Sequence, residues 1–254
     1  MINHMPPKEY LAEIRRRIEL ESKNQSLTEV KTDLLNQMNW NRYAYNFTWF
    51  GRPVIQIPQD AMSFQEMIWE VRPDLIIETG IAHGGSLIFS ASMLALLELF
   101  GEVESPLVLG IDIDIRSLNR KAIEEHPAFR WIRMIEGSSV SPSIVAEVKA
   151  IAAQRKRVML FLDSNHTHDH VLAELEAYAE LVTVGSYVVV LDTGVEDIDP
   201  SAVATGRPWC RGNSPKSALN EFMIKTDQFV LDDYFHDKAW FSSFPGGVLR
   251  RTDK

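Results

Sequence analysis

From residue 60 onwards, short runs of Val, Ile and Leu alternate with longer segments in which apolar residues recur at helical spacing. The short runs predict buried strands over 74–78, 107–113, 129–135, 158–162 and 187–191. The segments between them predict helices over 60–71, 85–100, 117–125, 141–154 and 168–183. Buried strands that alternate with helices form a mostly parallel sheet covered on both faces. We therefore predict a doubly wound, Rossmann-like α/β fold.

The pattern becomes less regular after the fifth predicted strand. Residues 193–214 are rich in Gly, Asp and Pro, and this segment is too long for a simple connection. Long loops at the carboxyl edge of a sheet often bind ligands. A helix over 215–225 and short strands over 229–231 and 247–250 follow. We expect one of these strands to close the sheet in antiparallel orientation.

In the first 40 residues the pattern of apolar and polar positions differs from that in the rest of the chain. They predict two amphipathic helices, over 8–22 and 26–38, the second capped by Ser26 with Glu29 three residues later. We divide the chain into an N-terminal helical arm, residues 1–40, and a main domain, residues 41–254. The arm is a candidate oligomerisation element, and we expect a homo-oligomer.

Composition and charge exclude several classes of protein. The net charge is −9, which argues against a nucleic-acid-binding protein. A single Cys allows no internal disulfide and no Cys-based zinc site, which indicates a reducing compartment. The sequence lacks both a run of about 20 apolar residues and the apolar core of a signal peptide. We expect a cytoplasmic protein without membrane contact.

A glycine-rich segment follows the first predicted strand. Residues 79–86 read TGIAHGGS, and a helix begins directly afterwards. Glycines here allow a tight turn and close approach of a ligand to the backbone. The spacing matches neither the G-x-G-x-x-G fingerprint nor a P-loop, so a neutral or cationic cofactor is favoured over a phosphate. A tight turn without a ligand is the alternative.

The ends of the next two strands suggest an adenosine site. Asp112 ends the second predicted strand, where a carboxylate can accept both hydroxyls of a ribose. Ser138 lies in a small polar turn after the third strand, which suits the edge of an adenine. Because the carboxyl ends of parallel strands meet at one edge, these residues should lie close to the glycine turn.

The fourth and fifth strands end in carboxylates. Asp163 and Asp192 lie on neighbouring strand ends, and oxygen ligands of this kind suit Mg²⁺. His166, three residues after Asp163, is a candidate general base for a hydroxyl substrate. His166 and His170 have the i, i+4 spacing of zinc ligands, but no H-E-x-x-H motif is present. We expect His168 and His170 to make structural hydrogen bonds.

Four motifs carry a family resemblance: Glu78-Thr79-Gly80, His83-Gly84-Gly85-Ser86, Gly110-Ile111-Asp112-Ile113-Asp114 and Asp163-Ser164-Asn165-His166. Over residues 40–250 the chain resembles the cephalosporin hydroxylase/rhamnosyl O-methyltransferase family of S-adenosylmethionine-dependent methyltransferases. The resemblance implies that Glu78, Gly80 and Ser86 line the methionine end of the cofactor, with His83, Gly84 and Asp163 in the same cofactor site. It also implies the ribose role of Asp112 and the adenine role of Ser138.

The resemblance implies a catalytic site as well. His166 would be the base, and Asp163 and Asp192 would be ligands of a Mg²⁺ ion. Apart from the resemblance, Thr193 or Asn165 could supply a neutral oxygen ligand. The chain departs from the family in one respect, since Leu191 stands where a Glu is expected. That departure leaves fewer carboxylates for the cation.

The function implied is transfer of a methyl group to a hydroxyl of a sugar or natural product, a small-molecule acceptor. We expect the aromatic residues of 43–50 and the loop 195–213, including Trp209, to overhang the crevice and bind this acceptor. The alternative is that they seal the core or a subunit interface. Two alternatives are a methyltransferase-fold binding or scaffold protein without turnover, and a nicotinamide-dependent oxidoreductase. The missing G-x-G-x-x-G fingerprint disfavours the oxidoreductase.

Overall fold

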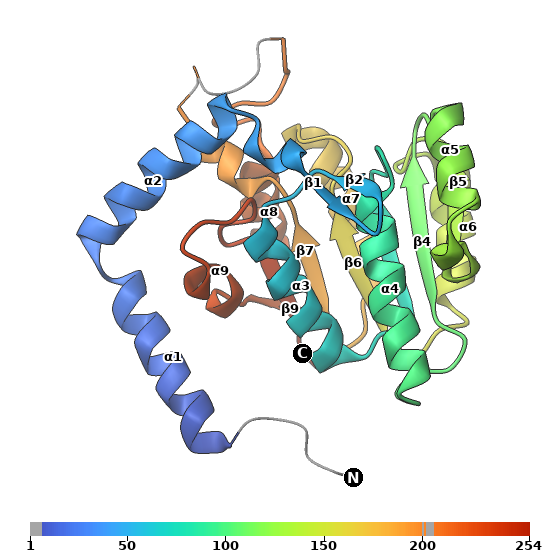
Figure 1. Cartoon of the computed structure of the whole chain (residues 1–254), viewed down its shortest axis with the longest axis horizontal. Helices are drawn as coiled ribbons and strands as arrows, with labels where there is room; N and C mark the ends of the chain where they lie inside the picture. The colour runs from blue at the N-terminus through green and yellow to red at the C-terminus, as the bar shows by residue number, and fades with distance from the viewer. Residues whose placement is uncertain (1–6, 200, 202–205) are drawn as a thin grey trace.

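The computed structural model describes residues 7–199, 201 and 206–254. Residues 1–6 of the predicted arm, and residues 200 and 202–205 of the predicted crevice loop, lie outside the described residues. A seven-stranded sheet with the order β5-β4-β3-β6-β7-β9-β8 forms the centre of the fold, and helices flank it (Figure 1). Its strands are β3 (Leu75–Thr79), β4 (Leu107–Asp112), β5 (Ile132–Glu136), β6 (Val158–Leu162), β7 (Tyr187–Val190), β8 (Phe229–Leu231) and β9 (Val248–Arg251).

The strand order places a crevice at the centre of the sheet. β3 pairs in parallel with both β4 and β6, so Leu75 lies opposite Leu107 on one side and Val158 on the other. After β3 the next two strands, β4 and β5, are added on one side of it, whereas β6 and β7 are added on the other side. The carboxyl ends of these two strands are therefore the point where doubly wound folds bind ligands. The antiparallel closing strand is confirmed, because β9 runs antiparallel to β7 and β8.

Both faces of the sheet are buried under helices. Along β3, Ile76 belongs to the core cluster that includes residues of α3 and α4, and Ile77 belongs to the cluster on the other face with α6, α7 and α8. The prediction of a doubly wound α/β fold is confirmed. The helices are α3 (Pro58–Val71), α4 (Gly85–Leu99), α5 (Ser117–Glu124), α6 (Pro142–Ala152), α7 (His168–Tyr178), α8 (Pro215–Lys225) and α9 (Tyr234–Lys238).

Two of the predicted boundaries that differ from the structure do so for local reasons. The third strand begins at Ile132, because residues Pro127–Trp131 form a 3-10 helix, η2, with the proline in its first turn. The second N-terminal helix begins earlier than predicted. Its cap is Asn24, whose Oδ1 accepts a hydrogen bond from the backbone N–H of Leu27 at 3.1 Å, in place of Ser26.

The N-terminal helices α1 (Lys8–Ser22) and α2 (Gln25–Trp40) extend from the main body (Figure 1). α1 lies beside α9, where the guanidinium of Arg15 is 5.3 Å from the ring centroid of Tyr234. Trp240 Nε1 donates a hydrogen bond to Glu21 at 3.2 Å. The division at residue 40 and the oligomer remain predictions. Within the described part of the chain, none of the helices has the length and apolar character that a membrane span requires.

The segment between α2 and α3 forms regular elements of its own. It contains a 3-10 helix, η1 (Tyr43–Asn46), and a hairpin of β1 (Phe47–Trp49) and β2 (Arg52–Val54). The hairpin contacts the start of α4, next to the glycine-rich turn. A segment that the sequence marks only by its aromatic residues therefore forms one wall of the crevice.

Candidate active site

The glycine-rich turn after β3 is in backbone contact with the end of β6. Gly80 has a φ of +89°, and a Cβ atom there would lie 2.1 Å from the carbonyl oxygen of Asp163. The backbone N–H of Asp163 also donates to the carbonyl of Thr79 at 3.0 Å. Only glycine combines this φ with so close an approach. The turn and Asp163 are thus held together as one unit.

Asp112 fixes the same turn from the end of β4. Its Oδ2 accepts hydrogen bonds from the backbone N–H groups of Ile81 at 2.8 Å and Ala82 at 3.2 Å, and its Oδ1 accepts one from Asp114 at 3.1 Å. The carboxylate is half-buried and faces the turn. The structure thus brings Asp112 to the predicted cofactor side, and its ribose role stays a prediction.

Two residues that the sequence did not single out clamp the turn from outside. The guanidinium of Arg52 donates to the carbonyl oxygen of His83 from Nη2 at 2.6 Å and to Asn119 Oδ1 at 3.1 Å. Asn119 Nδ2 donates in turn to the carbonyl oxygen of Ala82 at 2.8 Å. The clamp joins β2, the turn and α5, three segments far apart in the sequence. No local pattern indicates such a contact.

The paired glycines serve packing. A Cβ at Gly84 would lie 2.4 Å from Cδ1 of Ile123, and one at Gly85 would lie 2.2 Å from the carbonyl oxygen of Pro53. The start of α4 therefore packs directly on β2 and α5. The proposed cofactor contacts of His83 and Gly84 are predictions that this geometry leaves open.

Glu78 is a buried carboxyl group below the turn. It accepts hydrogen bonds from the hydroxyls of Ser86 and of Ser90, the latter at 3.5 Å. Burial raises the pKa of Glu78 to about 7, and the two serine hydrogen bonds oppose this rise. Ser86, predicted as a cofactor residue, is thus part of the same small network. The network places a titratable group beside the floor of the crevice.

A second buried carboxylate joins the predicted adenine side to the loop after β6. Glu174 Oε1 accepts hydrogen bonds from Ser139 Oγ at 2.5 Å and from Ser164 Oγ at 2.7 Å. His170 Nε2 lies 3.3 Å from the same oxygen. Ser138 itself accepts a backbone hydrogen bond from Ser141 at 3.0 Å. The turn after β5 and the loop after β6 are therefore held by one side chain.

The expectation that His168 and His170 make structural hydrogen bonds is confirmed. His168 Nδ1 lies 2.9 Å from Ser217 Oγ, and its Nε2 lies 3.1 Å from Glu221 Oε2. These contacts join the start of α7 to α8. His170 contacts the Glu174 network. Of the three histidines, His166 is the one that lines the crevice.

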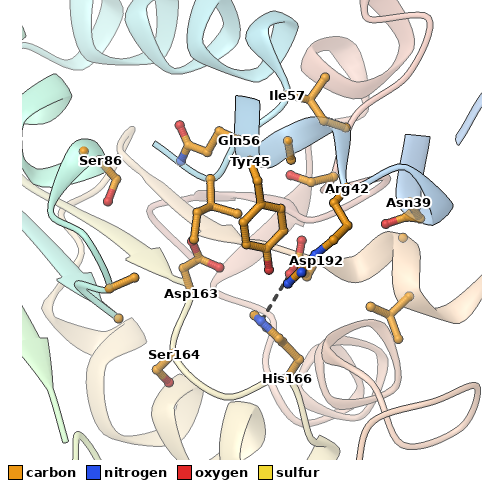
Figure 2. Close-up of a pocket in the computed structure, with 18 of the residues that line it drawn as sticks. Asn39, Arg42, Tyr45, Gln56, Ile57, Ser86, Asp163, Ser164, His166 and Asp192 are labelled. Carbon is orange, nitrogen blue, oxygen red and sulfur yellow. Dashed lines mark ion pairs between the residues drawn. The ribbon is translucent and has the colours of Figure 1, made fainter. Parts of the chain in front are cut away.

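Asp163, His166 and Asp192 come together at the carboxyl ends of β6 and β7 (Figure 2). One ligand atom from each lies within 4.8 Å of the others, and His166 Nε2 is 3.2 Å from Asp192 Oδ2. Burial, followed by the negative charges of Asp192, Glu78 and Glu174, raises the pKa of Asp163 well above its usual range. Two carboxylates held this close suit a hard cation.

Thr193 lies next to this cluster in the sequence, but its hydroxyl has another partner. The side chain is buried, and Oγ1 donates to the carbonyl oxygen of Pro245 at 3.1 Å. Its oxygen keeps acceptor capacity, so the metal role of Thr193 stays a prediction. Leu191, the departure from the expected Glu, is buried and packs in the core.

The cluster opens into a cavity of about 370 Å³. Among the aromatic residues predicted to overhang it, Tyr45 and Trp209 line it, and the Trp209 ring centroid is 4.7 Å from that of His166. Trp49 packs on Phe89 at 4.9 Å and donates to Ser92 at 3.0 Å. The prediction is wrong for Trp49, because β1 directs this ring into the core. α2 also contributes to the wall of the cavity.

A doubly wound sheet, a glycine turn after the first central strand and carboxylates at the ends of four parallel strands define a Rossmann-like fold, which solved methyltransferase structures share. The chain belongs to the Rhamnosyl O-methyltransferase/CmcI family, which it matches over residues 41–252. This membership confirms the predicted kind of enzyme, an S-adenosylmethionine-dependent O-methyltransferase.

Curated relatives cover most of the chain. The Rhamnosyl O-methyltransferase of Mycobacterium leprae (strain TN) is 30% identical over 217 residues, which span 82% of this chain and 84% of the relative. The Rhamnosyl O-methyltransferase of Mycobacterium tuberculosis (strain ATCC 25618 / H37Rv) is 28% identical over 212 residues, 81% of this chain and 78% of the relative.

Solved structures share the fold at lower identity. The Mg-SAM structure of cmcI-D160 is 18% identical with a TM-score of 0.55, covering 82% of this chain and 77% of that chain. The O-methyltransferase from Bacillus cereus in complex with SAH is 14% identical with a TM-score of 0.51, covering 82% of this chain and 83% of that chain.

Proposed function

We propose that this protein transfers a methyl group from S-adenosylmethionine to a hydroxyl of a sugar or another hydroxylated natural product. The observation that carries the proposal is the cluster of Asp163, His166 and Asp192 at the floor of the cavity. A base and two carboxylates at the switch point of a doubly wound sheet suit deprotonation of a bound hydroxyl. The family and its curated Rhamnosyl O-methyltransferases support a sugar as acceptor.

The cofactor would lie along the ends of β3, β4 and β5. S-Adenosylmethionine supplies an electrophilic methyl group when bound. Glu78, Gly80 and Ser86, with His83 and Gly84, would surround its methionine end, and Asp112 and Ser138 would bind the adenosine. Gly80 and Ser86 line the cavity, and Glu78 adjoins it through its contact with Ser86, which supports this arrangement.

His166 is the proposed general base. Its imidazole would take the proton of the acceptor hydroxyl as the oxygen attacks the methyl carbon. Asp192, with Oδ2 3.2 Å from Nε2, would then stabilise the positive charge on the ring. The Trp209 ring packs edge-to-face beside His166, with the ring centroids 4.7 Å apart. All three residues line the cavity.

Asp163 and Asp192 would hold a Mg²⁺ ion, with Thr193 as a further oxygen ligand. The donor set fits, because a cation would stabilise the neighbouring carboxylates of Asp163 and Asp192. Burial, followed by the negative charge of Asp192, raises the pKa of Asp163. When bound, Mg²⁺ lowers the pKa of a coordinated hydroxyl and orients it. The homo-oligomer and the cytoplasmic location stay predictions from the sequence.

Binding of S-adenosylhomocysteine, measured by calorimetry, tests the donor site, and methyl transfer to a panel of rhamnosylated and other hydroxylated acceptors tests the activity. We expect binding at micromolar concentration and Mg²⁺-dependent product. Absence of S-adenosylhomocysteine binding would overturn the proposal. Binding of the cofactor without turnover of any acceptor would favour the alternative of a binding or scaffold protein.

A further inference from the structure

Two arginine–aromatic pairs stand on the walls of the cavity. The guanidinium carbon of Arg42 is 4.7 Å from the ring centroid of Tyr45, and that of Arg207 is 4.8 Å from the ring centroid of Trp209. All four residues line the same cavity as His166. Within the part of the chain that the structure describes, neither guanidinium forms an ion pair or a hydrogen bond with a protein group.

The two pairs come from separate parts of the chain. Arg42 is the N-terminal cap of η1 and has a φ of +53°, which turns the chain between α2 and the hairpin. Arg207 precedes Trp209 in the loop after β7. Figure 2 shows Arg42 and Tyr45 pointing into the cavity toward Asp192 and His166. The fold therefore brings two cations to the space in front of the proposed base.

The cavity carries charges of both signs. Asp163 and Asp192 form the acidic cluster, which the proposed metal would offset. The two guanidiniums lie on the walls of the same cavity, in a chain whose net charge is −9. Stacking on a ring holds a guanidinium in place and leaves its N–H edge available for a bidentate contact with a phosphate or carboxylate.

We infer that Arg42 and Arg207 bind an anionic group carried by the acceptor, so that the substrate class is a hydroxylated molecule bearing a phosphate or a carboxylate. This inference rests on the proposed function. The donor's own carboxylate is the competing partner for these arginines. Figure 2 places Ser86, on the proposed donor side, and Arg42 on opposite sides of Tyr45, which favours the acceptor.

The test uses the full chain with S-adenosylhomocysteine bound. Titration calorimetry with inorganic pyrophosphate measures affinity for a phosphate-type group, and titration with glucuronate measures affinity for a carboxylate-type group. The double variant R42Q/R207Q should lose about tenfold or more of the affinity for the preferred anion, because two charge-assisted contacts are removed. The variant R42K/R207K should keep part of that affinity.

Arg130→Gln is the matched control, because the Arg130 guanidinium also stacks on a ring, 4.5 Å from the centroid of Trp131, but does not line the cavity. It should leave anion affinity unchanged. The inference is overturned if the wild type binds neither anion, if R42Q/R207Q binds as tightly as the wild type, or if R130Q weakens binding equally.

The affinity for S-adenosylhomocysteine separates this inference from the proposed function. Unchanged affinity in R42Q/R207Q, with anion binding lost, supports the inference. A tenfold weaker affinity for S-adenosylhomocysteine in that variant would assign the arginines to the donor and overturn it. Failure of the wild type to bind S-adenosylhomocysteine would reject the proposed function itself.

Discussion

The imidazole Nε2 of His166 lies 3.2 Å from Oδ2 of Asp192, although the whole of α7 and β7 lies between them in the sequence. The contact forms because β6 and β7 are parallel neighbours, so that the residues after each strand meet at one edge of the sheet. It unites the proposed base with the residue that would stabilise its charge.

Replacing His166 by alanine tests this pair. We expect H166A to lower kcat by about 10²–10⁴-fold, since a positioned general base contributes on that scale. Binding of S-adenosylhomocysteine should remain close to that of the wild type. Single-turnover methylation and calorimetry measure the two effects separately.

His168→Ala is the control for this variant. His168 begins the same helix and contacts Ser217 and Glu221, away from the cavity. H168A should keep most of the activity while losing some stability. Equal activity of H166A and wild type would contradict the assignment of the base.

Chelation tests the proposed cation. Treatment with EDTA should abolish most of the methyl transfer, and Mg²⁺ should restore it. Mg²⁺ should also raise the Tm of the wild type, because a ligand that binds the native state stabilises it. Asp163→Asn should lose both responses. Full activity in EDTA would exclude a role for the metal.

Asp169→Asn is the matched control for the metal variant. Asp169 is an exposed carboxylate in the first turn of α7, close in sequence to the cluster but not part of it. This variant should keep the response of activity and Tm to Mg²⁺. Loss of that response in D169N would show that general surface charge, and not the cluster, binds the ion.

Gly80→Ala should destabilise the protein by several kcal/mol. The new methyl group would lie 2.1 Å from the carbonyl oxygen of Asp163, at a backbone φ of +89°. Gly51→Ala isolates the second effect, because Gly51 has a φ of +84° with no atom within 4 Å of its Cβ position. A non-glycine residue at such a φ lowers the free energy of unfolding by about 1–2 kcal/mol. Urea unfolding of both variants should show the larger loss for G80A, and equal losses would contradict the close contact.

Asp60→Asn should change how stability depends on pH. Burial raises the pKa of Asp60 to about 6 in the native protein, from a usual value of 3.8, against the hydrogen bonds that Ser243 donates to it. Between these values the native state binds more protons than the unfolded state, so the free energy of unfolding of the wild type falls as pH rises. Above pH 6 the full cost of the buried charge is present.

D60N carries no such charge. Its stability relative to the wild type should therefore grow from pH 4 to pH 7, up to about 3 kcal/mol, from a shift of about two pKa units. Asp227→Asn, at an exposed position, should show no such growth. Thermal unfolding across this pH range measures the difference. A stability difference that is constant with pH would contradict the raised pKa.

Much of the fold follows from local patterns. The β6 segment is predicted with the observed boundaries, because a run of buried apolar residues between polar ones has one stable location, the centre of a covered sheet. The start of β5 is wrong by three residues, because η2 precedes it. Asp163 and Asp192 are found by their place after such runs. The same rule brings His166 to the crevice, because a strand end fixes the position of the loop that follows it.

Other features depend on contacts between distant segments. Trp49 turns into the core and Tyr45 into the cavity, although both belong to one aromatic run, because the hairpin β1–β2 sets the direction of each side chain. The clamp of Arg52 on His83, and the meeting of Arg42 and Arg207 at one cavity, require β2, η1 and the loop after β7 to pack around the turn.

The sequence by itself therefore determined the class of fold, the strand ends that carry the candidate polar residues and the chemical type of the proposed centre. These properties depend on hydrophobic period and on residues within a few positions of a strand end. Only the tertiary structure decided which side chains line the cavity, since that depends on how separate segments pack. The walls of the cavity, with Arg42 and Arg207, carry no periodic signal and become visible only in three dimensions.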